Sequence, residues 1–292
     1  MKRLVWLASY PKSGNTWVRL FLEAYCHPDR ALDINSIDIS LHAGNRDLFD
    51  RVIGLEASDL IPAEIDRYRP DVYRQLAVEA EEPLFIKVHD GWRRNADGAP
   101  LFPPEVTAAT LYIVRDPRGV APSFANHYHL SLDAAIERMA KAGQGIAARM
   151  DRLPSQLPQP MGSWSQHVAG WLDQRDLPLH LVRYEDLHAV PTATFAGILA
   201  AAGLPVDEER LATALAESRF ERLRGQEAAT GFKERLLGSP RFFRRGQPES
   251  WRAELTAAQQ ARILAAHGPV MARLGYLPPP AQGAKAVVAG DR

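Results

Sequence analysis

Four short apolar runs, each the length of a buried strand, constrain the fold of this 292-residue chain more than any other feature. They cover residues 4–8, 84–88, 111–114 and 179–182. Stretches with helical spacing of apolar residues lie between them, for example around Trp17 and around Trp171. Strands that alternate with helices predict an α/β fold, in which helices flank both faces of a central parallel sheet.

Polar residues that can handle charge follow each of these runs. In chain order they are Lys12 with Ser13, then His89, then Arg115, and finally Tyr184 with Glu185. In an open parallel sheet, the ligand crevice lies beyond the carboxyl ends of the strands. We therefore expect these groups to converge on one site, although they are far apart in the sequence.

Composition limits the partners of the chain. Its 35 basic residues balance its 35 acidic residues, so no global field would hold nucleic acid or an anionic membrane, and any anion site must be local. The single cysteine, Cys26, is expected to be a packed thiol and is typical of a reducing compartment. We find no ligand spacing typical of a metal site and no apolar run of the ~20 residues that a membrane helix needs. The sequence predicts a cytoplasmic protein without a membrane span.

The length and the hydrophobic content suit one large core, and we expect a single domain over residues 1–276 with mobile cap loops. Residues 27–82, polar and helix-like without a clear strand, and the proline-rich residues 153–161 are expected to form this cap and to carry specificity. Residues 277–292 contain consecutive prolines and a Gly/Ala-rich stretch, and are expected to be a flexible tail.

Residues 9–17, Ser-Tyr-Pro-Lys-Ser-Gly-Asn-Thr-Trp, join the first expected strand to the first expected helix and are a candidate anion site. Gly14 would let the backbone approach a ligand closely, and the amides at the start of the helix would point at it. Lys12 precedes the glycine, whereas the lysine of a Walker A sequence directly follows the second glycine of that pattern. This order argues against an ordinary ATP-dependent kinase.

The segment resembles the 5′-phosphosulfate-binding loop of sulfotransferases that use 3′-phosphoadenosine-5′-phosphosulfate (PAPS), which typically reads Tyr-Pro-Lys-Ser/Ala-Gly-Thr/Asn-Thr-Trp. The resemblance implies a P-loop-like sulfotransferase fold of the cytosolic type, PAPS as the cosubstrate and no metal. It implies that Lys12 stabilises charge on the bridging oxygen. The residues it implies for the cosubstrate in this loop are Pro11, Ser13, Gly14, Asn15, Thr16 and Trp17.

The segment Arg-Asp-Pro-Arg-Gly-Val follows the third apolar run. It begins with Arg115, and Ser123 lies about two helical turns further on. A guanidinium at a strand end and this hydroxyl can both donate to one phosphate. The segment is similar to the part of PAPS-dependent sulfotransferases that binds the 3′-phosphate, although a surface arginine with a helix-capping serine is the plain alternative.

Lys87-Val88-His89 resembles the Lys-x-His of the same family, in which the histidine is the general base. A neutral imidazole with an ordinary pKa near ~6.5 can remove the proton of an attacking hydroxyl. Lys87 is expected to assist Lys12. Asp90 stands where a leucine or threonine often follows, and we expect its carboxylate to raise the pKa of His89.

Two further segments resemble nucleotide-binding elements of the family. Tyr184 matches the tyrosine of a Tyr-Glu-Asp/Glu-Leu segment near the nucleotide, and a core aromatic is an equally open interpretation. Thr230 and Phe232 match a Thr-x-Phe element that flanks the adenine. Residues 162–164, Gly-Ser-Trp, are similar to a helix start common among bacterial members, including those that sulfate glycopeptides.

The last matching segment is similar to the family's Arg-Lys-Gly-x-x-Gly-x-Trp motif, which closes over the 3′-phosphate. Arg244, Arg245 and Gly246 match it, with Arg245 in place of the lysine. Glu249 replaces the second glycine and is expected to bring a negative charge close to the anion site. A basic loop on a solvated face is the alternative. The resemblance runs to about Trp251 and so covers nearly the whole chain.

The sequence therefore predicts in-line transfer of a sulfuryl group from PAPS to a hydroxyl of a small-molecule acceptor. The acceptor site is expected between residues 27–82, residues 153–161 and the segment before Phe242. Steroid-like, glycopeptide, sugar and lipid alcohols all stay open, as does a homo-oligomer. A P-loop-type kinase and a catalytically silent nucleotide-binding protein are the competing hypotheses, which stabilisation by adenosine 3′,5′-bisphosphate (PAP) or by ATP with magnesium would separate.

Overall fold

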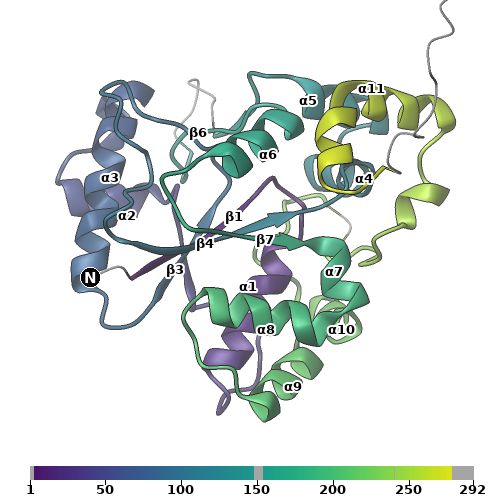
Figure 1. Ribbon diagram of the computed structural model, residues 1–292, viewed down its shortest axis with the longest axis horizontal. Helices are drawn as coiled ribbons and strands as arrows, with labels where there is room; N and C mark the ends of the chain where they lie inside the picture. Colours follow the sequence, from purple (N-terminus) through teal and green to yellow (C-terminus); the bar gives the residue numbers. More distant parts are fainter. Residues whose placement is uncertain (1–2, 148–153, 240, 278–292) are drawn as a thin grey trace, which may run out of the picture.

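A five-stranded parallel sheet forms the centre of the protein, with strand order β2-β3-β1-β4-β7 (Figure 1). The computed structural model describes residues 3–147, 154–239 and 241–277. The strands of the sheet are β1 (Leu4–Ser9), β2 (Ser40–His42), β3 (Leu84–Val88), β4 (Thr107–Val114) and β7 (Leu179–Arg183). The predicted α/β fold is confirmed, and each of the four predicted apolar runs lies in a strand.

The middle strand, β1, sends alternate side chains into two separate cores. Leu4, Trp6 and Ala8 belong to one core, whereas Val5 and Leu7 belong to the other, and all five are fully buried. Successive side chains of a strand point to opposite faces, so a strand covered on both faces needs apolar residues at every position. This is why the sequence shows an unbroken apolar run here.

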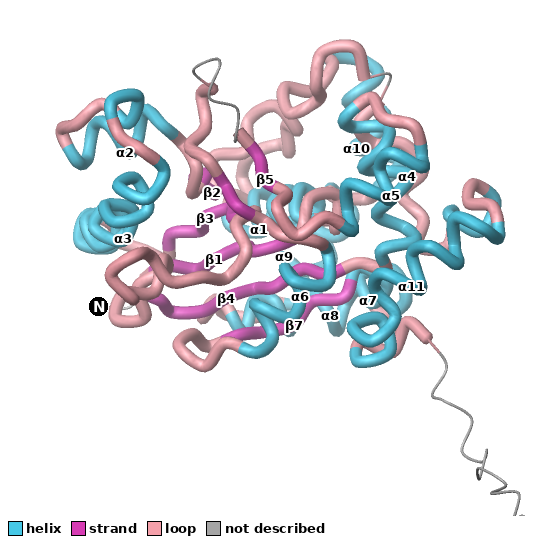
Figure 2. Tube along the Cα trace, turned by 90° about the horizontal axis from the view of Figure 1, so that it is seen from above, coloured by secondary structure: helices cyan, strands magenta, loops and turns pink. Residues whose placement is uncertain are grey.

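Helices cover both faces of the sheet (Figures 1 and 2). The core that contains Trp6 is completed by α3 (Pro62–Glu79), α4 (Pro117–Tyr128), α5 (Leu132–Ala140), α6 (Trp164–Asp173) and α11 (Ala257–Arg273). The core that contains Val5 is completed by α1 (Asn15–Cys26), α7 (Tyr184–Ala189), α8 (Pro191–Ala201) and α9 (Glu208–Glu217). A third, smaller core joins α1 to α10 (Phe220–Thr230). The helices expected around Trp17 and Trp171 are confirmed as α1 and α6.

Residues 27–82 contain a strand, so the expectation of no clear strand there is wrong. The short strand β2 pairs in parallel with β3, and His42 stands opposite Lys87 in the register. Its three residues, Ser-Leu-His, contain no apolar run that would indicate a strand. They form one because they pair with β3. The remaining elements of this segment are helical, namely α2 (Arg46–Ile53), the 3₁₀ turn η1 (Ala57–Asp59) and α3.

Short elements complete the described chain. A two-residue antiparallel pair joins β5 (Gly145–Ile146) to β6 (Gln159–Pro160), and a 3₁₀ turn, η2 (Ser250–Ala253), precedes α11. The expected flexible tail lies outside the described residues from position 278 onward, and the single domain over residues 1–276 stays a prediction. Within the described ranges, no helix has both the length and the apolarity to cross a bilayer.

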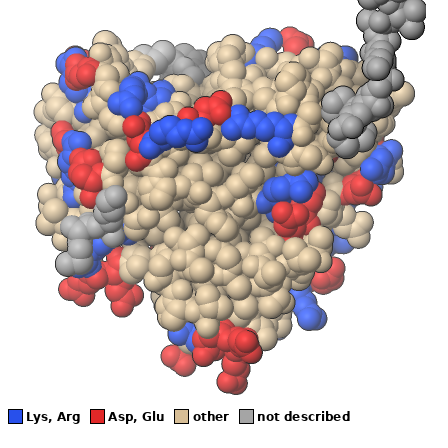
Figure 3. All heavy atoms as spheres, in the orientation of Figure 1, with Lys and Arg blue, Asp and Glu red and all other residues tan. Residues whose placement is uncertain are grey.

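Charged side chains of both signs are mixed over the face that Figure 3 displays. Cys26, at the end of α1, is partly buried against the core that contains Val5, and burial raises the pKa of its thiol to about 11. This environment fits a packed thiol, as expected, rather than a nucleophile.

Candidate active site

The carboxyl ends of the parallel strands border one cavity of about 480 Å³. The predicted convergence is therefore confirmed for Lys12, His89, Arg115 and Tyr184, but not for Ser13 or for Glu185, whose carboxylate accepts from the backbone nitrogen of Asp116 instead. The predicted residues that line this cavity are Pro11, Lys12, Gly14, Asn15, Thr16, Trp17, Lys87, His89, Arg115, Ser123, Tyr184, Arg244, Arg245 and Gly246. The structure does not bring Ser13, Thr230 or Phe232 to its surface.

The loop between β1 and α1 needs backbone angles that favour glycine. Gly14 has a φ of 109° and precedes the first residue of α1, and Lys12 also has a positive φ, of 70°. A Cβ atom at Gly14 would lie 2.7 Å from Cδ2 of the Tyr184 ring. Gly14 is therefore required by its backbone angle and by its packing against Tyr184, in addition to the close ligand approach expected from the sequence.

Asn15 braces this loop from within. Its Nδ2 donates to the backbone oxygen of Leu7 at 2.8 Å and to Oγ of Ser9 at 3.2 Å, which ties the start of α1 to β1. The first turn of any helix leaves backbone N–H groups without intrahelical partners, and here those groups border the cavity. The loop therefore has the geometry of an anion cradle.

Two lysines contribute positive charge to the cradle. Nζ of Lys12 lies 3.7 Å from the centroid of the Phe242 ring, and burial, followed by the nearby charge of Lys87, lowers the pKa of Lys12 to about 7. Nζ of Lys87 lies 3.5 Å from Oε2 of Glu234, and burial lowers its pKa as well. Lys12 and Lys87 are thus partly buried cations whose charge an anionic ligand would stabilise.

Glu234 is a residue of this site that the sequence analysis missed. Its carboxylate accepts from Nη1 of Arg19 at 2.6 Å and from Oγ1 of Thr16 at 3.2 Å. Burial alone would raise the pKa of Glu234, but Lys87 and Arg19 lower it to about 2. An ionised carboxylate therefore lines the cavity beside the cradle. Its only sequence signal was its place in the segment before Phe242.

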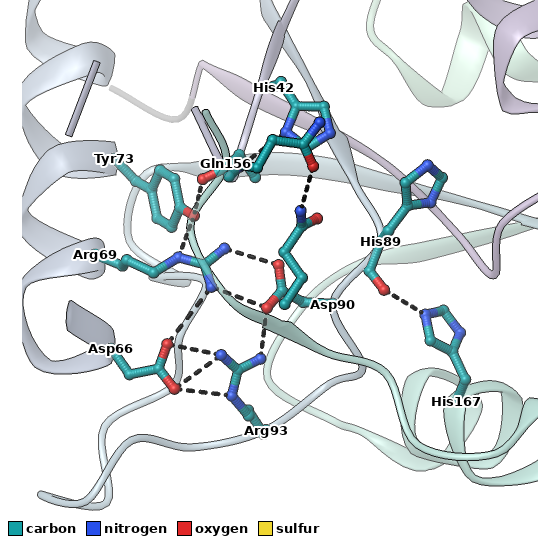
Figure 4. A network of polar contacts seen from close by, with 12 residues as sticks. His42, Asp66, Arg69, Tyr73, His89, Asp90, Arg93, Gln156 and His167 are labelled. Carbon is teal, nitrogen blue, oxygen red and sulfur yellow. Dashed lines mark hydrogen bonds and ion pairs between the residues drawn. The ribbon is translucent and has the colours of Figure 1, made fainter. Parts of the chain in front are cut away.

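His89 directly follows β3, and one of its ring nitrogens is hydrogen-bonded to the backbone. Nδ1 lies 2.8 Å from the backbone oxygen of Ser9, and a carbonyl oxygen only accepts, so Nδ1 carries the proton and Nε2 keeps its lone pair. Nε2 of His167 donates to the backbone oxygen of His89 at 3.2 Å (Figure 4). Burial and then the charge of Lys87 lower the pKa of His89 well below its usual value. His89 is therefore a neutral proton acceptor.

Asp90 does not raise the pKa of His89, so that expectation is wrong. Its fully buried side chain turns to Arg69, with contacts of 2.8 and 2.9 Å, and to Nη1 of Arg93 at 2.7 Å (Figure 4). Burial would raise the pKa of Asp90, but these two arginines hold it well below its usual range. Because both arginines compensate its charge, burial and Lys87 decide the pKa of His89 instead.

Arg115 lines the same cavity as the two lysines. Its Cζ is 4.2 Å from the centroid of the Tyr184 ring, and its terminal nitrogens make only long contacts, of 3.4 and 3.3 Å, to backbone oxygens of Lys12 and Gln247. Tyr184 is buried yet lines the cavity, so it serves both as a core aromatic and as a wall under Arg115. Ser123, on α4, lines the same cavity.

The late basic motif closes another side of the cavity. Gly246 has a φ of 63°, and a Cβ atom there would lie 2.2 Å from Cδ2 of Phe220. Nη2 of Arg244 donates to Oε1 of Glu254 at 3.0 Å. Glu249, by contrast, is exposed and pairs with Arg252 at 2.9 Å. The negative charge expected from Glu249 thus points away, and Glu254 is the carboxylate that contacts the motif.

The Thr-x-Phe element lies off the cavity. Thr230 is exposed at the end of α10, where its hydroxyl donates to the backbone oxygen of Gln226 at 3.1 Å. Phe232 is buried in the small core beside Phe243, and Ser13 is a fully buried residue of the loop itself. Contacts of these three residues with the cosubstrate stay predictions. Among the residues that the structure describes, no cluster of His, Cys, Asp and Glu is placed to hold a metal ion.

A strand–loop–helix anion cradle with a neutral histidine at the next strand end defines a P-loop-like group-transfer protein. The chain belongs to the sulfotransferase family, because the model of the sulfotransferase domain matches residues 2–275. The predicted family is confirmed.

Relatives of known name agree with this assignment. The chain is similar to human Sulfotransferase 2B1, with 24% identity over 261 residues, which is 87% of this chain and 62% of the relative. It therefore spans less than two thirds of the human protein. Similarity to rat Sulfotransferase 2A6 is 25% over 260 residues, 87% of this chain and 79% of the relative.

A solved structure shows the same fold. It is retinol dehydratase in complex with androsterone and the inactive cofactor PAP, with a TM-score of 0.62 and 18% identity over 92% of this chain and 81% of that chain. The predicted sulfotransferase fold is therefore confirmed.

Proposed function

We propose that this chain transfers a sulfuryl group from PAPS to a hydroxyl of a small-molecule acceptor, with His89 as the general base. The observation that carries the proposal is the hydrogen bond from Nδ1 of His89 to the backbone oxygen of Ser9. It leaves an unprotonated Nε2 on a residue that lines the same cavity as Lys12 and Arg115. A base of this kind is needed when an alcohol attacks, because the oxygen must lose its proton.

The cavity suits an anionic nucleotide. Nε1 of Trp17, Nε of Arg115 and Nε of Arg244 are buried donors on lining residues, and none has a hydrogen-bond partner among the described residues. A buried donor without a partner costs about 1–3 kcal/mol, so acceptor oxygens of a ligand would be stabilising here. The PAP complex of the solved fold relative supports the same ligand class.

The assignment of residues follows the geometry of the cavity. The amides of the loop and of the start of α1 would hold the 5′-phosphosulfate. Arg115 and Ser123 would bind the 3′-phosphate, and Arg244, Arg245 and Gly246 would close over it. PAPS would supply the activated sulfuryl group, and no protein-bound metal is needed for this transfer.

The protein's own contribution would be alignment and charge stabilisation. His89 would take the proton of the attacking hydroxyl through Nε2. Lys12, with help from Lys87, would stabilise negative charge that develops on the bridging oxygen. A displacement in line requires the acceptor oxygen and the leaving oxygen to be held on opposite sides, which a rigid cavity between strand ends and cap favours.

All three segments expected to form the acceptor site reach the cavity. They contribute His42 from residues 27–82, Gln156 from residues 153–161, and Lys233, Glu234 and Leu236 from the segment before Phe242. These side chains are predominantly polar, which favours a hydroxylated small molecule. The cytoplasmic location, the mobility of the cap and a homo-oligomer stay predictions.

The test separates binding from chemistry. His89→Asn should bind PAP in calorimetry like the parent but transfer sulfuryl groups to alcohols at least ~100-fold more slowly, the usual effect of losing a general base. His180→Asn, a partly buried histidine on β7 that does not line the cavity, is the matched control. A His89→Asn protein that binds PAP and keeps near-parental turnover would refute the role of His89. Stabilisation by ATP with magnesium, but not by PAP, would favour a kinase instead.

A further inference from the structure

His42 is a second imidazole at the cavity. It ends the edge strand β2 opposite Lys87, and its ring centroid lies 6.3 Å from that of His89 (Figure 4). Both rings line the same cavity, and Gln156 lies beside His42 on the cap side. His127 lines the cavity as well, so the cavity holds imidazoles beyond the one base that the proposed chemistry needs.

One hydrogen bond fixes the tautomer of His42. Its Nδ1 lies 3.0 Å from the backbone nitrogen of Gly44, whose N–H can only donate. Nδ1 must therefore accept, and a neutral imidazole in this position carries its proton on Nε2. Burial, followed by the charges of Lys87 and Arg19, lowers the pKa of His42 to about 3, which keeps the ring neutral near pH 7. Nε2–H of His42 is a committed donor.

His42 and His89 thus have opposite hydrogen-bonding roles. Nε2 of His89 accepts, because its Nδ1–H is bound to Ser9, whereas Nε2 of His42 donates. Within the described part of the chain, no residue accepts a hydrogen bond from Nε2 of His42. A donor left without a protein partner at a ligand cavity has a ligand acceptor as its natural partner.

A buried network holds the two rings relative to one another. Arg69 pairs with Asp90, which follows His89, and its Nε donates to the hydroxyl of Tyr73 at 3.1 Å. That hydroxyl donates to the backbone oxygen of Ala43, which follows His42, at 3.2 Å. One connected set of side chains therefore braces the residues after both imidazoles (Figure 4), so their spacing is a fixed feature of the site.

We propose that His42 is a specificity-determining residue that donates a hydrogen bond through Nε2 to a second oxygen of the acceptor, next to the hydroxyl that His89 deprotonates. The inference rests on the proposed function, because it takes His89 as the base. A donor to the attacking oxygen itself would withdraw electron density from the nucleophile, so the useful target is the neighbouring oxygen. The acceptor class is then a vicinal diol or polyol, such as a sugar, rather than an isolated alcohol.

Three matched probe alcohols test this assignment with PAPS as donor: cyclohexanol, cyclohexane-1,2-diol and 2-methoxycyclohexanol. The parent should prefer the two probes with a neighbouring oxygen by roughly tenfold in kcat/KM, the effect of one hydrogen bond in the transition state. His42→Leu, which removes the donor, should reduce this preference to about one. His42→Gln, whose amide can donate from a similar position, should restore part of it.

Equal kcat/KM values for the three probes in the parent, or a preference that persists in His42→Leu, would overturn the proposal. A parent that binds PAP but transfers to none of the probes would instead count against the proposed function.

A second measurement needs no turnover. Nitrogen-15 NMR of histidine-labelled protein with PAP should show the proton of His42 on Nε2 and that of His89 on Nδ1, with signals assigned by their loss in His42→Gln and His89→Asn. A proton on Nδ1 of His42 would overturn the donor role.

Discussion

The two halves of the cavity are built differently. The strand-end half contains Lys12, His89 and Arg115, which lie at the carboxyl ends of the three central parallel strands β1, β3 and β4. The cap half contains His42, from a three-residue edge strand, and Glu234, from an irregular segment. The first half lies at the ends of central strands, whereas the second lies on an edge strand and on an irregular segment that Arg19 contacts through Glu234.

The difference shows where each half is vulnerable. The loop of the strand-end half is tied by Asn15 to the backbone of β1. The cap half depends on ion pairs with other elements, among them the buried pair of Arg69 with Asp90 and the partly buried pair of Arg19 with Glu234. A buried pair is strongly destabilised when one partner is removed, because the other charge is left uncompensated. Substitutions in the buried pair should therefore lower the stability of the fold. Substitutions of Lys12 or Arg115 should instead change transfer or cosubstrate binding.

The largest expected effect comes from the buried pair of the cap half. Asp90→Ala should lower the free energy of unfolding by about 3–5 kcal/mol, because Arg69, only 1% exposed, loses its bidentate partner. Urea denaturation at pH 7 measures this loss. Since the pKa of Asp90 is depressed in the folded state, the contribution is present above the unfolded carboxyl pKa of about 3.9 and disappears as pH falls further.

Asp97→Ala is the matched control for Asp90→Ala. It breaks an ion pair with Arg67 at 2.7 Å that is exposed on the surface, so the urea midpoint should hardly move. Similar urea midpoints for the two variants would contradict the claim that the buried pair of Arg69 with Asp90 stabilises the fold.

The next largest effect belongs to the strand-end half. Lys12→Ala should slow sulfuryl transfer by ~100-fold, about 2.7 kcal/mol, because its charge acts on the oxygen that becomes negative in the transition state. The affinity for PAP in calorimetry should change only by a modest factor. Lys233→Ala, an exposed lysine at the same cavity, should change the single-turnover rate far less. A Lys12→Ala rate within threefold of the parent would show that the role is wrong.

A smaller effect should mark the 3′-phosphate. Arg115→Ala should weaken PAPS binding by ~1.5–3 kcal/mol, the contribution of a charge-assisted hydrogen bond. Binding of adenosine 5′-phosphosulfate, which lacks the 3′-phosphate, should weaken much less. Calorimetry of both ligands on both proteins measures the difference, and equal losses would place Arg115 elsewhere in the site.

The smallest effect concerns pH. Burial lowers the pKa of Lys12 to about 7, so its charged form is present below that pH and kcat/KM should fall as pH rises through it. The pKa of His89 is also depressed, so the base stays neutral at pH 6.5 and the acid limb should lie well below that value. Lys12→Arg should remove the alkaline limb, because arginine stays charged. A profile that rises through pH 7 would contradict both assignments.

How far the sequence predicts the site differs between the halves for a physical reason. His89 and Arg115 follow apolar runs directly, and Lys12 lies in the loop after the first run, so a local pattern places all three at the sheet edge. His42 and Glu234 have no such local mark, because their places depend on β3 and on Arg19. Asp90 was noticed in the sequence, but it does not raise the pKa of His89 as expected, since its partner Arg69, which compensates its charge, lies on another element, α3.

The central claim is that the strand-end half is a cradle for PAPS, and one calorimetric series tests it most directly. PAPS, adenosine 5′-phosphosulfate and ATP with magnesium are titrated into the parent chain under the same conditions. The account predicts that PAPS binds most tightly, that loss of the 3′-phosphate weakens binding by ~10-fold or more, and that ATP with magnesium binds weakest. Tighter binding of ATP with magnesium than of PAPS would contradict it.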